Sequence, residues 1–352
     1  MERYIGLDVH AKSCTCAVVG ATGKRLRVDV VETHGETLVR WLKSVAGQWH
    51  VCFEEGTQSA WLHELLAPHA VEVVVVSPPK RQGVKNDERD ALWLANQLRR
   101  GGHARPIYKA PSAWSGLRDA VRGYEMVTRD VVRVKNRLRA VCRSRGLSDP
   151  SAALYDADSR KAVLAPLPTS ARDLGELLGR ELDALAELRD QAHQHLSEQA
   201  EPQAIVQRLT RVPGLGPIRA AQIAAVVVTP LRFRTTRQFW SYCGLGIVTR
   251  SSADWKQQDG RWARTQVAQP RGLNRNRNGM LKSVFKGAAL AVATRMPHHP
   301  LHADYQRQLA AGTKPNLARL TLARRIAAIA LAMWKHNEEY DPARHRRKEA
   351  TT

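Results

Sequence analysis

The stretch YIGLDVHAKSCTCAVVGATGKRLRVDVVE, residues 4–32, decides the fold of the first part of the chain. It contains three segments in which apolar or β-branched side chains alternate with others, at residues 4–9, 14–20 and 24–32. The connections between them are short, and the second contains glycines suited to a tight turn. Short connections join antiparallel neighbours, so we expect three consecutive antiparallel strands.

Beyond residue 32 the pattern alternates between helix and strand. Helical spacing over residues 35–47 precedes a strand at 50–55, and a helix beginning near Ser59 precedes an apolar run at 71–78 that is typical of a buried strand. Another amphipathic helix follows at 84–98. This order fits a ribonuclease-H-like (RuvC-like) sheet, in which the later strands are added in parallel through helices. We therefore expect an α/β domain over residues 1–111.

The remainder of the chain is predicted to be mostly helical. Residues 112–205 contain two long periodic stretches, at 117–147 and 171–200, and form the expected helical middle region. The second stretch places leucines at three- and four-residue steps, at Leu174, Leu178, Leu182, Leu185 and Leu188. This spacing predicts either an antiparallel hairpin or coiled-coil interface, or an ordinary bundle helix.

A third domain is expected over residues 206–352. Its segment at 208–227 places Pro-Gly-Leu-Gly between two helical stretches, which is typical of a helix–hairpin–helix that brings backbone N–H groups to a DNA phosphate. The stretch at 269–283 is basic, rich in asparagine and predicted to be a loop that follows phosphates. The apolar face of the helix at 317–337 is expected in the core.

Charge is the strongest compositional signal. The formal net charge is +22 and the isoelectric point is about 10.4, which indicates a polyanionic partner. The basic residues lie in several blocks and no apolar run is long enough for a membrane span, so nucleic acid is favoured over a membrane surface. An apolar secretory core is also lacking near the start, and a cytoplasmic, nucleoid-associated protein is expected.

Acidic residues occur where a metal-dependent nuclease of this fold needs them. Asp8 interrupts the apolar first strand, and Glu54 and Glu55 close the fourth strand. Asp87 and Asp90 lie three positions apart at a helix start and share a face, although acidic residues there are also ordinary helix caps. Carboxylate oxygens are the ligands that Mg²⁺ prefers, and paired ions stabilise phosphoryl transfer. The set predicts a divalent-metal site.

Several segments resemble known transposases. YIGLDVHAK (4–12), FEEGTQSAWL (53–62), VVVVSPPK (73–80) and KNDERDALWLA (85–95) resemble the N-terminal DEDD domain of insertion-sequence transposases of the "one-hundred-ten" family. LTRVPGLGPIRAAQIAAVV (209–227), RQFWSYCGLGIVTRSS (237–252) and NRNRNGMLK (274–282) resemble the C-terminal transposase domain of that family. The resemblance covers nearly the whole chain.

The resemblance implies a recombinase that cuts and joins double-stranded DNA, with Mg²⁺ at the acidic cluster. It also implies a structured guide (bridge) RNA as partner, assembly as a dimer or tetramer, and a nucleophilic serine. Asp8, Asp87 and Asp90 match the family aspartates, and Glu54 is the expected glutamate, with Glu55 the alternative. Counting from the Gly-Leu after the Phe places the serine at Ser252, with Ser251 the alternative.

Basic residues in two blocks are the expected nucleic-acid contacts, which are Arg133, Lys135, Arg137, Arg139, Arg143, Arg264, Arg271, Arg275, Arg277 and Lys282. Three alternatives compete with the transposase. A sugar-kinase or actin-like ATPase shares the strand-one GLD, but needs two repeated halves that this chain lacks. A Holliday-junction-resolvase-like nuclease would use the same acids. A non-catalytic nucleic-acid-binding protein is disfavoured by the intact acids.

Overall fold

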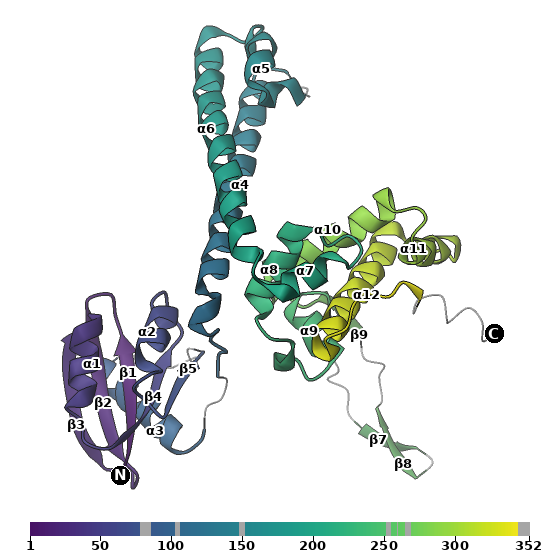
Figure 1. Cartoon of the computed structure of the whole chain (residues 1–352). Coiled ribbons are helices and arrows are strands. Elements are labelled where there is room, and N and C mark those ends of the chain that lie inside the picture. The colour runs from purple at the N-terminus through teal and green to yellow at the C-terminus, as the bar shows by residue number, and fades with distance from the viewer. Residues whose placement is uncertain are drawn as a thin grey trace. The chain divides into compact units, whose positions relative to one another are not determined.

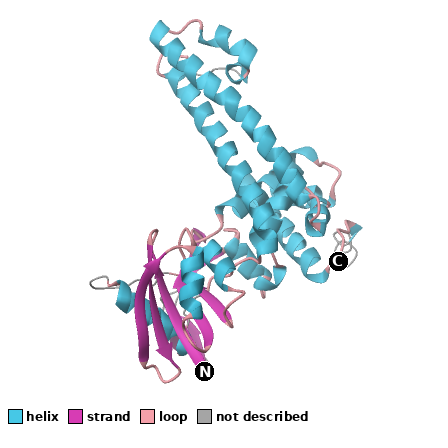
Figure 2. Ribbon diagram, turned by 60° about the vertical axis from the view of Figure 1, so that its left-hand side comes forward, coloured by secondary structure: helices cyan, strands magenta, loops and turns pink. Residues whose placement is uncertain are grey.

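The computed structural model describes residues 1–77, 86–102, 106–147, 152–250, 255–258, 260–264 and 269–343 of the chain. The chain divides into two compact units, Met1–Ala113 and Trp114–Thr352. The first unit is a mixed α/β domain and the second is built mostly of helices (Figure 2). No helix among the described residues combines the length and the apolar character needed to cross a lipid bilayer.

The first unit is organised around a five-stranded sheet. Its elements in chain order are β1 (Glu2–Val9), β2 (Ser13–Gly20), β3 (Arg25–Glu32), α1 (Gly35–Lys43), β4 (Gln48–Glu54), α2 (Ser59–Leu66), β5 (Glu72–Val76) and α3 (Asp87–Arg99). The strands lie in the order β3-β2-β1-β4-β5. The β1–β2 and β2–β3 pairs are antiparallel, and the β1–β4 and β4–β5 pairs are parallel. The predicted antiparallel pairing of the first three strands and the parallel addition of the later two are thus confirmed.

Alternation of side chains along the strands gives the sheet two different faces. Ile5 and Leu7 of β1 point into an apolar core that they share with α1 and α2. Cys52 of β4 and Val76 of β5 point to the opposite face, where they pack with Leu94 of α3. Figure 1 shows these helices and the sheet, coloured purple and blue. The α3 face is the one that carries the acidic residues.

Gly6 sets how closely α3 approaches β1. A Cβ on Gly6 would lie 1.9 Å from the carbonyl oxygen of Ala91 and 2.6 Å from the backbone nitrogen of Ala95. Ala91 and Ala95 are both fully buried, so small residues meet across the contact. Backbone therefore packs directly on backbone, and any larger residue at position 6 would force the helix away from the sheet.

The second unit begins with a long helical hairpin. Its helices are α4 (Ser115–Arg143), α5 (Ala157–Leu164) and α6 (Thr169–Ala200). Helices α4 and α6 lie side by side, and α5 lies at the end of the hairpin where they are joined (Figure 1). Val134 and Leu138 of α4, Leu164 of α5 and Leu182 of α6 share one buried core. The predicted long helices are confirmed.

The leucine pattern of α6 is only partly a packing seam. Leu182 is buried, but Leu174 and Leu188 are 47% and 49% exposed. The buried face of α6 instead includes Gly175 and Gly179, because α5 packs against these glycines. A Cβ on Gly175 would lie 2.9 Å from the side chain of Leu164. The predicted hairpin is thus present, but Leu174 and Leu188 do not lie in its buried core, and glycines make the closest approach to α5.

The rest of the second unit is an alanine-rich helical domain with small β ribbons. Its helices are α7 (Ala204–Thr210), α8 (Pro217–Val227), α9 (Thr236–Tyr242), α10 (Gly279–Arg295), α11 (Pro300–Ala310) and α12 (Pro315–His336). Buried alanines of α8, α10 and α12 let the helices approach closely in one core. Two ribbons pair β6 (Ile247–Arg250) with β9 (Gln269–Leu273), and β7 (Trp255–Gln258) with β8 (Arg261–Arg264).

The segment at 269–283 is not the predicted loop. Its first residues form β9, which pairs with β6, and its last residues belong to α10. The loop prediction failed because β6 lies about twenty residues earlier in the chain, a separation that local composition does not report. Asn278 caps α10, since its side chain accepts a hydrogen bond from the Leu281 backbone N–H at 3.0 Å.

The two glycines of the Pro-Gly-Leu-Gly segment have different roles. Gly214 has a φ of +78°, and a Cβ there would lie 2.4 Å from the carbonyl oxygen of Ala288. This glycine is therefore required by packing against α10. Gly216 is exposed, precedes α8 and has open space around the position of a Cβ. Contact with a phosphate remains a prediction for Gly216 and is not needed to explain Gly214.

Candidate active site

The first two acidic residues come together because β1 and β4 are parallel and end at the same edge of the sheet. The strands pair Leu7 with Phe53, so Asp8 and Glu54 follow at adjacent positions on the α3 face. Both residues line one cavity of about 320 Å³. The side chain of Asp8 is 14% exposed, so its carboxylate lies largely out of solvent.

The next two acidic residues lie at the start of α3, just before the part of the helix that contacts Gly6. Asn86 caps this helix, because its side chain accepts a hydrogen bond from the Arg89 backbone N–H at 3.0 Å. Asp87 is the first residue of the helix, and Asp90 lies one turn later and is buried. Because Asn86 already caps the helix, neither aspartate is needed as the cap.

A histidine links the strand and the helix. His10 Nε2 lies 3.5 Å from Asp8 Oδ2 and 3.3 Å from Asp87 Oδ2. One ligand atom from each of these three residues lies within 4.8 Å of the others, a spacing that suits a bound metal ion. Asp8 and Asp87 are predicted from the sequence, whereas His10 is not, although its position two residues after Asp8 was a usable signal. Glu54 lines the same cavity but is not one of the three residues of this cluster. Asp90 lies one turn further along α3 than Asp87 and is buried.

The alternative glutamate, Glu55, is engaged elsewhere. Its carboxylate forms an ion pair with Lys109 and accepts a hydrogen bond from the Ser59 hydroxyl at 3.1 Å. Lys109 also donates to Ser59 at 2.7 Å, and its side chain is 9% exposed. Glu55 therefore belongs to a structural network that joins α2 to the segment following α3. This leaves Glu54, on the α3 face, as the better candidate for a metal ligand.

Two family models match this chain. Residues 5–144, which hold the cluster, match DEDD_Tnp_IS110, described as a transposase. Residues 206–306 match the transposase IS116/IS110/IS902 family. Two segments of this chain thus match models of IS110 family transposase domains. The DEDD match and the Asp8–His10–Asp87 cluster together indicate a divalent-metal site in the first unit.

Two curated transposases are similar to this IS110-type chain. A probable family 20 transposase of Pseudomonas aeruginosa is 28% identical over 218 residues, which make up 58% of this chain and 62% of that protein. The transposase for insertion sequence element IS1533 of Leptospira borgpetersenii is 29% identical over 105 residues, which make up 27% of this chain and 30% of that protein. The chain thus spans about three fifths of the first relative and under a third of the second.

The predicted nucleophilic serine falls between described segments. Ser251 and Ser252 follow β6 directly in sequence but lie outside the residues that the structure describes. Both are within the second family match, residues 206–306. The assignment of Ser252 as nucleophile, with Ser251 as the alternative, therefore remains a prediction.

The predicted nucleic-acid contacts on α4 are partly neutralised. Arg133 pairs with Asp130 at 2.6 Å, and Arg137 lies 3.8 Å from Glu181 of α6. Lys135 and Arg139 lie over the ring of Tyr155 at 4.8 and 5.5 Å, respectively. Arg143 is the last residue of the helix. The two carboxylates offset part of the positive charge of α4, whereas Lys135 and Arg139 keep their charge over the ring.

The remaining predicted contacts lie in the IS110-type C-terminal domain. Arg264 ends β8 and Arg271 lies in β9. Arg275 and Arg277 belong to the connection before α10, and Lys282 lies in its first turns. The Arg277 side chain crosses Gly244, where a Cβ would lie 1.9 Å from Arg277 Cδ. Gly244 has a φ of +67°, so its place in the Cys-Gly-Leu-Gly segment is required both by backbone geometry and by this crossing.

Proposed function

We propose that this protein is an insertion-sequence transposase that cuts and rejoins double-stranded DNA. Its catalytic metal site comprises Asp8, Glu54, Asp87 and Asp90, with Ser252 as the nucleophile that holds the cut strand. The observation that carries the proposal is the convergence of Asp8, His10 and Asp87 at the edge of the sheet, within a domain that matches DEDD transposases. The strand order β3-β2-β1-β4-β5 supports a ribonuclease-H-like fold for this domain.

The residues of the site fit a divalent cation. Carboxylate oxygens from β1, β4 and α3 are the ligands that Mg²⁺ and Mn²⁺ prefer, and we propose Mg²⁺ as the resident ion. Bound metal would supply stabilisation of negative charge on the oxygens of the phosphodiester. The chain itself holds the acids at fixed spacing through the Gly6 contact and the Asn86 cap. His10, between Asp8 and Asp87, positions these two carboxylates relative to each other.

The test compares two carboxylates in the same helical turn. Asp87 faces His10, whereas Glu88 pairs with Arg25 on the edge strand β3. The assay is Mg²⁺-dependent nicking or strand exchange on DNA that carries the ends of the element. We expect Asp87→Asn to reduce the rate at least about 100-fold, since a ligand matters more than the partners around it, and Glu88→Gln to leave it nearly unchanged. Equal rates in both variants would refute the metal site.

The serine is tested by trapping its covalent product. A serine hydroxyl that attacks a phosphodiester forms a phosphoserine bond, and the leaving 3′ or 5′ oxygen takes up a proton. We expect Ser252→Ala to abolish a denaturation-resistant protein–DNA adduct while Ser251→Ala retains it. The reverse result would move the role to Ser251. Cleavage by the wild type without any adduct would support instead a resolvase-like nuclease, in which water is the nucleophile. An adduct that persists in the double variant would assign the covalent bond to a residue other than Ser251 and Ser252.

The partners are proposed on the same basis. The transposase matches imply DNA binding. A guide (bridge) RNA and a dimeric or tetrameric assembly follow from the family resemblance, and a protein of this charge suits both nucleic acids. Sequencing the nucleic acid that co-purifies with the protein tests the RNA. Recovery of random cellular RNA, without enrichment of sequence flanking the gene, would count against a guide.

A further inference from the structure

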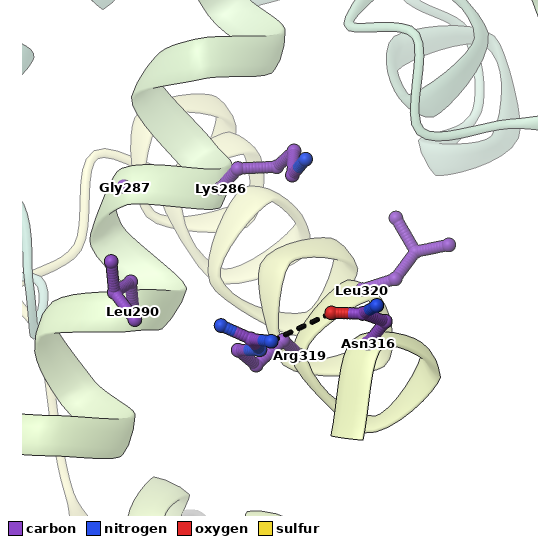
Figure 3. Close-up of a pocket in the computed structure, with 6 residues that line it drawn as sticks. All are labelled: Lys286, Gly287, Leu290, Asn316, Arg319 and Leu320. Carbon is purple, nitrogen blue, oxygen red and sulfur yellow. Dashed lines mark hydrogen bonds between the residues drawn. The ribbon is translucent and has the colours of Figure 1, made fainter. Parts of the chain in front are cut away.

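The second unit contains an open groove between α10 and α12. Figure 3 shows Lys286 and Leu290 projecting from α10, with Arg319 and Asn316 on α12. Its volume is about 510 Å³, and Gly287 and Leu320 complete its lining. The groove thus combines two cationic side chains with an apolar surface made by two leucines.

Among the residues that the structure describes, no carboxylate forms an ion pair with Lys286 or Arg319. Arg319 donates to the Asn316 side-chain oxygen at 2.6 Å, which holds the guanidinium along α12 without neutralising it. Leu290 is 46% exposed, so the apolar surface of the groove is open to solvent. An acidic ligand would therefore meet uncompensated charge, and an apolar part of the same ligand would cover the leucine.

The surrounding helices reinforce the positive potential. Helices α7, α8, α10 and α12 together contain nine lysines and arginines and no aspartate or glutamate. Lys282 lies one turn before Lys286 on the same face of α10. Burial, followed by the positive charges of Arg277 and Lys286, lowers the pKa of Lys282. Cations thus follow one another along α10, from the connection preceding the helix to the groove.

The charge and shape select the occupant. A polynucleotide strand offers phosphates at regular spacing with sugars between them, which matches cations separated by apolar surface. An acidic peptide would bring carboxylates but would gain little from a continuous line of cations on one helix. We propose that the α10–α12 groove binds a polynucleotide strand, with phosphate on Lys286 and Arg319 and sugar against Leu290. The class of partner rests on the proposed function.

The test removes two charges from the groove and compares them with a charge on the other side of α10. Arg295 lies nine residues after Lys286, which is half a turn around the helix, so it faces away from Lys286. The full-length double variant Lys286→Gln with Arg319→Gln is compared with Arg295→Gln. Affinities for labelled duplex DNA, single-stranded DNA and single-stranded RNA of one sequence are measured over a range of salt concentrations. Thermal unfolding confirms that each variant is folded.

The expected result is a change of slope. If both cations contact phosphates, the slope of log affinity against log salt should fall by about 1.8 on duplex DNA and about 1.4 on a single strand. Arg295→Gln should leave the slope unchanged. The nucleic acid for which the double variant shows the full fall in slope is the type of strand that the groove binds. An equal change of slope in both variants would overturn the proposal for the groove. The proposed function would still stand in that case, provided that binding by the wild type depends on salt. A wild type with no salt dependence would overturn both. Asp87→Asn, in the other unit, should retain the wild-type slope while losing cleavage.

Discussion

Replacing Gly6 with alanine tests the contact that joins the two halves of the candidate metal site. The added methyl would lie 1.9 Å from the carbonyl oxygen of Ala91 and 2.6 Å from the nitrogen of Ala95. Both blocking atoms belong to the backbone of α3, so no side-chain rotation relieves the overlap. The helix must withdraw by about 1 Å to restore even a 3 Å contact.

The expected cost is at the upper end of the range for overfilled cores, about 3 kcal/mol in the free energy of unfolding of the first unit. Withdrawal of α3 loosens Leu94 and Leu98, which are buried against the sheet. Reduced backbone freedom in the unfolded chain returns less than about 1 kcal/mol, which does not offset the overlap. The same movement separates Asp87 from His10 and should lower metal-dependent cleavage.

The assay is chemical denaturation of the full chain, with hydrogen exchange at the amides of α3 to locate the effect. Gly20→Ala is the matched control, because it lies in the same sheet and its Cβ would meet Leu26 at an ordinary 3.5 Å. We expect faster exchange in α3 for Gly6→Ala and no change for Gly20→Ala. Equal stability and equal exchange in the two variants would refute the reasoning about backbone packing.

Two further predictions concern other parts of the molecule. Burial lowers the pKa of His50, but hydrogen bonds to Glu2 and Glu72 outweigh it and the pKa is raised. The stabilisation of the fold by protonated His50 should therefore be complete below the unfolded pKa of about 6.5 and disappear as pH rises through the folded pKa. When unfolding is measured against pH, His50→Gln should show no such loss of stability. In the hairpin, the buried Arg160 donates to both oxygens of Asp183, so Arg160→Met should cost about 2 kcal/mol in denaturant unfolding, and a cost below about 0.5 kcal/mol would contradict this.

Much of the first unit could be predicted because its information is local. Alternation along residues 4–32 defines three strands, and the apolar run before Ser77 defines the buried β5. Parallel pairing then follows from the helices between strands, since they are long enough for crossovers. Local pattern fails where partners are distant in sequence, as for β6 and β9, and where glycine replaces a large side chain at a contact, as in α6.

The candidate site was predictable by residue type but not by detailed contact. The carboxylates were identifiable because an acid in an apolar strand is costly unless it has a use. The roles of His10 and Glu55 depend on which side chains lie across a gap, and the strand pattern does not report that. Asp87, which contacts His10, belongs to a separate helix, α3. Lys109, which pairs with Glu55, lies in the segment that follows α3. The geometry therefore adds support to the preference for Glu54 over Glu55 that the sequence already indicates, and the role of Glu54 as a ligand stays a prediction.

The absence of acidic side chains from α7, α8, α10 and α12 has a consequence for the lifetime of the protein. Like charges packed into one small domain repel one another, and counterions or a bound polyanion relieve this repulsion. A partner present at 100 times its dissociation constant adds about 2.7 kcal/mol to the stability of the folded state. We expect copies without nucleic acid to unfold and be degraded first, so that the abundance of the protein follows the supply of its partner.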